Sequence, residues 1–139
     1  MKQIEQIKLA FLWLLVVTGI IFHSVFSLDS LFYGANIQLP GTDGSEPTVF
    51  VVSHIVFGVG SLLMVLLTLL IESRGFVWFN RIWASLMGLL NAVHLIATFG
   101  ESPFCIEQIL LLSFVLATNI VLVVRLWKPM ESKPELETE

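Results

Sequence analysis

Side chains that could bind a ligand or carry a proton interrupt the apolar stretches of this 139-residue chain. His23, His54 and His94 each lie in a different apolar stretch, and Glu107 lies in a fourth. Asn91 precedes His94 in the segment "NAVHLIATFGE". An imidazole can accept, donate or relay a proton near neutral pH, and it can also coordinate a metal ion. The chemistry open to these residues therefore depends on whether the fold brings them together.

The composition is that of a membrane protein. Hydrophobic residues make up 56% of the chain and charged residues only 13%, against roughly 45–50% and roughly 25% in soluble domains. About 20 helical residues cross a hydrocarbon core about 30 Å thick. Four apolar runs reach that length, at about residues 7–28, 49–71, 77–99 and 104–127.

These runs predict an all-α fold, a polytopic membrane protein built as a four-transmembrane-helix up-down bundle. The connectors "ESRGF" and "GESPF" are short, and short connectors join antiparallel neighbours. We expect residues 1–128 to form one transmembrane domain. Residues 129–139 are charged, contain two prolines and lack a hydrophobic period, so we expect a solvated cytoplasmic tail.

The distribution of charge predicts the orientation. Lys and Arg occur before or at the start of the first run, just before or near the start of the third, and at or after the end of the fourth. The other two loops contain only acidic charges. Cytoplasmic loops are enriched in Lys and Arg, so both termini are predicted to be cytoplasmic. The basic, apolar start also has the pattern of a signal peptide, but its long apolar run and the absence of an A-x-A-like site favour an uncleaved anchor.

The predicted topology brings the titratable residues to one depth. His23 and His94 lie near the ends of the first and third runs, and His54 and Glu107 lie near the starts of the second and fourth. Each is roughly three to six residues inside its helix end, or about 5–9 Å below the interface. In an up-down bundle all four therefore lie toward the non-cytoplasmic side of the membrane.

Helical periodicity predicts that these residues also face the protein interior. At about 100° per residue, His54, Ser61 and Thr68 share one face of the second run, and Glu107 shares a face of the fourth with Thr118. Polar side chains in lipid cost free energy, so they are expected to face protein or a water-filled cavity. The sequence thus predicts an outward-facing polar cavity. Its candidate ligand-binding residues are His23, His54, Asn91, His94 and Glu107.

One interpretation of these residues is structural. Polar side chains that hydrogen-bond across transmembrane helices stabilise a bundle by about 0.6–2 kcal/mol each. Ala84, Gly88 and Ala92 also form a ridge of small residues, which permits close approach of another helix. Under this interpretation the chain is a homo-oligomer or a subunit of a membrane complex that docks through the ridge.

A second interpretation is a metal or haem site formed by His23, His54, His94 and Glu107. Neutral imidazoles with a carboxylate suit zinc, copper or iron, and bundle cores hold such sites. No two of the histidines lie in the same run, so the chain lacks the paired His-x-x-x-His or Glu-x-x-His pattern that most strongly indicates one.

A third interpretation is a pocket for a small amphiphile such as a quinone or a lipid, in which a His or Glu side chain relays a proton. Apolar walls with a few convergent polar groups are typical of ligand sites. We prefer this interpretation to a metal site, although the sequence predicts neither a reaction nor an enzyme. The net charge of −4 and the absence of a basic patch argue against nucleic acid as a partner.

The hydropathy pattern, with "TGIIFHS" in the first run and "NAVHL" in the third, resembles the small four-helix bacterial membrane proteins grouped as DoxX-like. This resemblance implies a bacterial inner-membrane location. It also implies a link to quinone or respiratory oxidoreductase chemistry, which some relatives of that kind have. It assigns no functional residues.

Overall fold

The computed structural model describes residues 3–34, 45–100 and 105–128, and within these ranges every regular element is helical. The elements are α1 (Gln3–Asp29), η1 (Ser30–Tyr33), α2 (Thr48–Ser53), the π-helix η2 (His54–Val59), α3 (Gly60–Leu70), α4 (Arg74–Thr98) and α5 (Ile106–Trp127). They form four helical segments that are long and apolar enough to cross a membrane, namely Gln3–Tyr33, Thr48–Leu70, Arg74–Thr98 and Ile106–Trp127. The prediction of four long apolar helices is confirmed. The predicted tail, residues 129–139, lies outside the described residues.

The helices begin and end at local signals. Ser73 caps α4, where its hydroxyl oxygen accepts a hydrogen bond from the backbone N–H of Phe76 at 3.2 Å, which satisfies one of the donors left unpaired in the first turn. Gly34 follows η1 with a φ of 76°, a backbone conformation that residues with a Cβ rarely adopt. The chain therefore leaves the first helical segment at a residue that permits a sharp turn.

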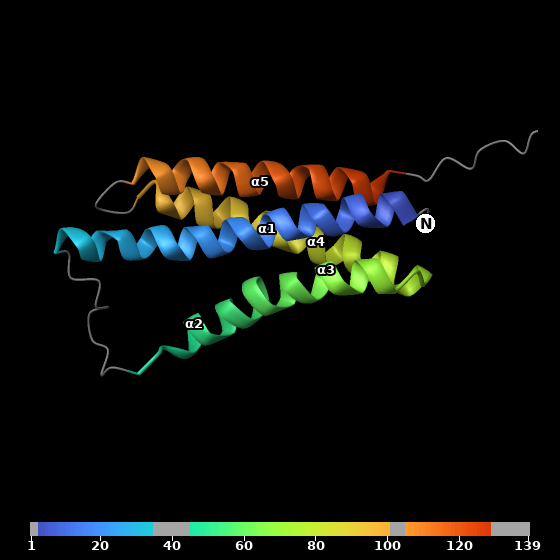
Figure 1. The fold of residues 1–139 in the computed structure, drawn as a ribbon, viewed down its shortest axis with the longest axis horizontal. Helices are drawn as coiled ribbons and strands as arrows, with labels where there is room; N and C mark the ends of the chain where they lie inside the picture. The colour runs from blue at the N-terminus through green and yellow to red at the C-terminus, as the bar shows by residue number, and fades with distance from the viewer. Residues whose placement is uncertain (1–2, 35–44, 101–104, 129–139) are drawn as a thin grey trace, which may run out of the picture.

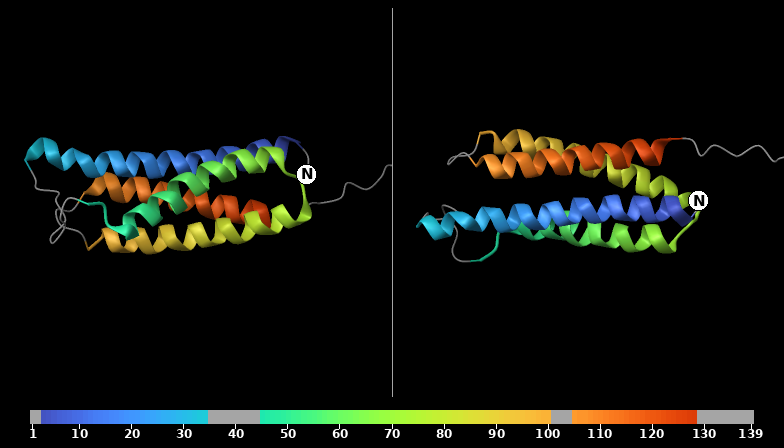
Figure 2. Two further views of the ribbon diagram at one scale, coloured as in Figure 1. Left: turned by 90° about the horizontal axis from the view of Figure 1, so that it is seen from below. Right: turned by 45° about the horizontal axis from the view of Figure 1, so that its top comes forward.

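Helix α1 packs against both α3 and α5, and α5 packs also against α4, as the two views of Figure 2 show. Gly19 permits the close approach of α1 to α5, because a Cβ at this position would collide with the Val115 side chain. Figure 1 shows the start of α1, the end of α5 and the α3–α4 connection at one end of the molecule. We call this the terminal end, and the opposite end, which contains Asp29 and Thr98, the cavity end.

The hydrophobic core lies toward the terminal end and encloses a polar network. Its buried cluster comprises Leu9, Trp13, Met64, Phe76, Ala84, Met87, Leu122 and Leu126. Within it, the Trp13 indole N–H donates to Asn80 Oδ1 at 3.0 Å, and Asn80 Nδ2 donates to Thr68 Oγ1 at 3.1 Å. These two bonds connect α1, α4 and α3, and all three side chains are fully or almost fully buried.

Aromatic and basic side chains also connect α4 to α5 at the terminal end. The Arg81 guanidinium lies over the rings of Trp78 and Trp127, at 5.1 and 5.5 Å from their centroids. Its Nε donates to the carbonyl of Leu126 at 2.8 Å. The start of α4 is thereby fixed to the end of α5.

The second helical segment diverges from the bundle toward the cavity end. Figure 1 shows α2 lying away from the other helices, and none of its residues is buried. The divergence coincides with η2, where the i→i+5 hydrogen bonds of a π-helix give each turn more residues than an α-helical turn has. Single π-helical turns inside α-helices are rare and occur frequently at functional sites.

The small-residue ridge lies largely inside the chain. Ala84 is completely buried in the core, and a Cβ at Gly88 would lie 3.7 Å from Asn119 on α5. A partner helix could not reach Ala84 without entering the packed core. Ala84 therefore serves the packing of this chain, whereas Gly88 and Ala92 are partly exposed, and docking of a partner through the ridge stays a prediction.

Candidate functional site

Two of the predicted residues meet between α1 and α4 at the cavity end. The Nε2 atoms of His23 and His94 lie 3.0 Å apart. The two rings are edge to face, with centroids 4.9 Å apart and planes at 88°. These residues are 71 positions apart in sequence, so the fold alone brings them together.

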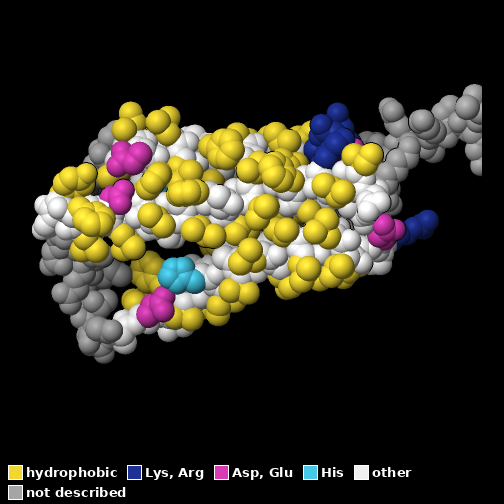
Figure 3. Space-filling model, in the orientation of Figure 1, with side chains coloured by type: hydrophobic (Ala, Val, Ile, Leu, Met, Phe, Trp, Pro, Cys, Tyr) yellow, Lys and Arg dark blue, Asp and Glu magenta, His cyan; other side chains and the backbone are white. Residues whose placement is uncertain are grey.

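The histidine pair borders a cavity of about 610 Å³, which lies between α1, the diverging α2–η2 segment and α4. The space-filling view shows this face of the molecule hollowed between α1 and α2 (Figure 3). Four of the predicted residues, His23, His54, Asn91 and His94, line the cavity. Apolar side chains complete its wall, including Phe50, Phe57 and Leu112. The cavity has the size that is usual for a small-molecule site, about 300–1,000 Å³.

His54 lies at the exposed edge of the cavity rather than in the histidine pair. Its Nδ1 is 3.0 Å from a carboxylate oxygen of Glu46, and the two side chains are 69% and 53% exposed. The prediction that His54 shares a buried face with Ser61 and Thr68 is wrong, because only Ser61 and Thr68 are buried. The π-helical turn η2 separates His54 from α3 and rotates it away from the α-helical face.

Most hydroxyl groups of the cavity wall are already hydrogen-bonded. Three serine hydroxyls donate to the carbonyl four residues earlier in their own helices, those of Ser24, Ser27 and Ser53. Such bonds within a helix are common for serine. The serine protons are therefore used locally, which leaves the amide and the imidazoles as the distinctive polar groups of the cavity.

Two buried atoms of the cavity residues have no hydrogen-bond partner among the described residues. They are Nδ2 of Asn91 and Nδ1 of His23. Asn91 is only 3% exposed. A buried polar group without a partner costs about 1–3 kcal/mol, and each such group in a native structure calls for an explanation. Both residues line the cavity, so a ligand there can become the partner of these atoms if the side chains turn toward it, because the two atoms themselves are buried.

Glu107 does not belong to the cavity, and this prediction is wrong. Its side chain is exposed on α5, and it is not among the cavity residues. The adjacent residue, Gln108, is 8% exposed and donates to Ser27 Oγ at 3.5 Å. The inward face of α5 therefore begins one residue later than predicted, which rotates Glu107 by about 100° from the interior. Gln108 was not predicted as a site residue, although its position beside Glu107 was the available signal.

The predicted metal set is not assembled in the described residues. No group of three or more His, Cys, Asp or Glu side chains there is arranged to hold a metal ion. His23 and His94 supply two nitrogens, whereas catalytic zinc sites use three protein ligands and structural sites four. Two axial histidines of a haem must stand on opposite faces of the macrocycle, but these two are in direct contact. The donor geometry therefore gives no support for a metal or haem site.

The histidine pair can hold and pass a proton. A hydrogen bond between two Nε2 atoms requires one protonated nitrogen as donor and one unprotonated nitrogen as acceptor. At least one ring is therefore neutral while the bond exists. A proton taken up by His94, which is exposed, can move across the 3.0 Å contact to His23, whose Nδ1 is buried and has no hydrogen-bond partner among the described residues.

No protein-family model, curated protein or solved structure significantly matches this chain. The resemblance to DoxX-like proteins therefore stays a prediction, and the function is argued from the site itself.

Proposed function

We propose that this chain is a multi-pass membrane protein whose cavity binds a small amphiphile of the quinone type, as a redox-linked or accessory component. The membrane setting is supported by four long apolar helices and by large apolar side chains that are exposed all along them, such as Leu66, Ile82, Leu89, Leu110 and Ile120. Exposed apolar surface of this extent is what lipid covers. Figure 3 shows the middle of one face as mainly apolar, with charged side chains toward the two ends.

In this proposal the helices form an up-down bundle in the inner membrane, with both termini in the cytoplasm. The basic residues of the described chain, including Lys8, Arg74, Arg81, Arg125 and Lys128, lie in the segments that form the terminal end, which the positive-inside rule assigns to the cytoplasm. The cavity then opens toward the opposite side of the membrane, or sideways into the lipid past α2.

The ligand class follows from the groups that lack partners. The Asn91 amide nitrogen is a donor, which suits a carbonyl oxygen. His23 Nδ1 donates or accepts according to its tautomer, so it can bond to a carbonyl in one redox state and to a hydroxyl in the other. Phe50 and Phe57 in the wall suit an aromatic ring. A quinone headgroup combines these features. When an external electron donor or acceptor interconverts quinone and hydroquinone, two protons are exchanged, and the histidine pair can give or take one of them.

The observation that carries the proposal is the unpartnered Asn91 amide in a cavity, and a matched pair of variants tests it. Asn91→Leu removes this amide, whereas Asn119→Leu removes another buried asparagine with an unpartnered atom that is not a cavity residue. We expect the full chain in detergent to bind a decyl-substituted benzoquinone in equilibrium dialysis. N91L should weaken binding about tenfold, the effect of about 1.4 kcal/mol, and N119L should leave it unchanged.

The same measurement distinguishes ligand binding from a purely structural role. If the polar residues only stabilise the bundle, the benzoquinone will not bind at a single site, or N91L and N119L will change its retention equally. Either result would refute the assignment of the cavity as a quinone site.

A further inference from the structure

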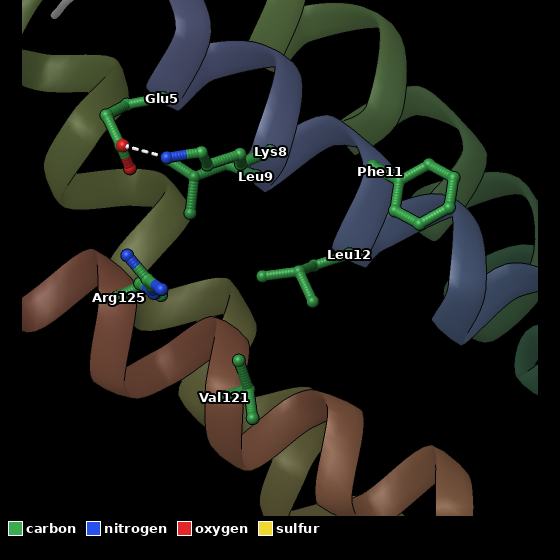
Figure 4. A pocket seen from close by; sticks show the side chains of 7 residues that line it. All are labelled: Glu5, Lys8, Leu9, Phe11, Leu12, Val121 and Arg125. Carbon is green, nitrogen blue, oxygen red and sulfur yellow. Dashed lines mark hydrogen bonds and ion pairs between the residues drawn. The ribbon is translucent and has the colours of Figure 1, made fainter.

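A second, smaller hollow lies on the lipid-facing side at the terminal end, far along the helices from the histidine pair. It has a volume of about 210 Å³ and is formed by α1 and α5. Lys8 and Arg125 are its basic residues, Glu5 is its acidic residue, and Phe11, Leu12 and Val121 are among its apolar residues. Figure 4 shows Leu12, Val121 and Arg125 in the space between the two helices and the Lys8 amine directed toward Glu5. We call this hollow the α1–α5 groove.

The groove carries one net positive charge. Lys8 Nζ is 2.7 Å from Glu5 Oε1, so these two charges compensate each other. Arg125 is exposed and has no hydrogen bond or ion pair with the other described residues. The Arg125 guanidinium is thus the group whose charge and hydrogen-bond donors are available to a ligand. Its planar set of donors matches the oxygens of a phosphate.

The basic and apolar residues are arranged in order along the groove. Phe11 and Leu12 follow Lys8 by three and four residues on α1, and Val121 precedes Arg125 by four residues on α5. On both helices one turn, about 5.4 Å, therefore leads from the basic residue to apolar ones nearer the middle of the bundle. The groove is therefore charged at the end of the molecule and apolar nearer its middle. A phospholipid in the adjacent leaflet has the same order, with its charged headgroup at the surface and its acyl chains further in.

We propose that the α1–α5 groove binds an anionic phospholipid, with its phosphate on Arg125 and Lys8 and an acyl chain along Leu12 and Val121. Basic pockets between transmembrane helices on the cytoplasmic side are suited to anionic lipid headgroups. A net positive charge favours an anionic lipid over a zwitterionic one. This site rests on the membrane setting of the chain, and it does not depend on what the histidine-lined cavity binds.

Three single substitutions give distinct expectations. Arg125→Gln removes the open cation and should weaken binding about fivefold, the fold-change that corresponds to about 1 kcal/mol per basic residue. Glu5→Gln removes the competing carboxylate and releases Lys8, so it should strengthen binding by a similar factor. Arg74→Gln is the matched control, because it removes one positive charge from the start of α4 at the same end of the molecule, outside the groove.

The measurement is native mass spectrometry of the full chain in detergent, titrated with phosphatidylglycerol or phosphatidylcholine of equal chain length. We expect a first phosphatidylglycerol to bind more tightly than phosphatidylcholine, with affinities in the order E5Q, then wild type and R74Q, then R125Q. Equal binding of the two lipids, or equal losses in R125Q and R74Q, would overturn the proposal.

The acyl-chain part of the site is tested separately. Val121→Trp fills the apolar part of the groove and leaves every charge in place, so it should weaken the binding of the first phosphatidylglycerol. Inorganic phosphate should not displace the lipid at equal concentration. If phosphate competes fully, or V121W binds as wild type does, the groove is a simple anion site and the lipid assignment is wrong.

Discussion

Two buried asparagines on α4 should respond in opposite ways to the same substitution by leucine. Asn80 bonds to Trp13 and Thr68, so Asn80→Leu removes two interhelical hydrogen bonds. It also leaves a buried indole N–H and a buried hydroxyl without their present partner. At about 0.6–1.7 kcal/mol per bond within a membrane bundle, the loss is about 1–3 kcal/mol. Asn91 has a buried amide nitrogen without a partner, so Asn91→Leu should be neutral or stabilise the ligand-free chain by up to about 1 kcal/mol.

The free energy of unfolding can be compared by titrating the detergent-solubilised chain with sodium dodecyl sulfate and following its near-ultraviolet circular dichroism. The two substitutions are chemically identical and lie eleven residues apart on one helix, so general effects on helix formation cancel. The expected order of stability is N91L at or above wild type, with N80L clearly below it. An N91L variant that loses as much stability as N80L would show that the Asn91 amide is satisfied within the chain, and it would remove the main support for a ligand.

Two further predictions concern packing and topology. Gly19→Ala should destabilise the chain by about 1–3 kcal/mol in the same titration, because the added methyl group would collide with Val115. Gly75 has open space around it, so the control Gly75→Ala should stabilise α4 by about 0.5–1 kcal/mol. Equal effects of the two substitutions would contradict the close approach of α1 and α5. Cys105, at the N-cap of α5, should react with a membrane-impermeant maleimide in intact cells, whereas a cysteine placed at Lys133 in a Cys105→Ser background should react only after lysis. The reverse pattern of labelling would invert the proposed orientation.

The number and approximate limits of the helices could be predicted from sequence because each apolar run is long and its ends are marked by polar or glycine residues. The second run was predicted at 49–71 and the helical segment is Thr48–Leu70. The third begins at Arg74, three residues before the prediction. The apolar run does not include the first turn of α4, which Ser73 caps. Hydropathy locates the apolar part of a helix, whereas side-chain caps determine its first turn.

The site could be predicted less well, because depth and direction depend on different features. Depth follows from counting residues at about 1.5 Å each, and His23 and His94 do meet. To predict the direction in which a side chain points, the helix must be regular and the helices packed against it must be known. His54 is exposed because a π-helical turn interrupts the second segment. Glu107 is exposed because α5 turns Gln108 and Leu112 inward instead, and periodicity alone could not choose between two faces that each contain polar residues.

The uneven packing of the bundle explains why a cavity can exist at one end without making the whole chain unstable. The buried cluster and the Trp13–Asn80–Thr68 network lie toward the terminal end, where α1, α3, α4 and α5 are joined. At the cavity end α2 contributes no buried residue, so movement of α2 breaks few contacts. Segments with few buried apolar contacts open at low free-energy cost. Movement of α2 alone would therefore leave the core in place, because the residues of the second segment that pack against the core begin in η2, with Val56 and Phe57.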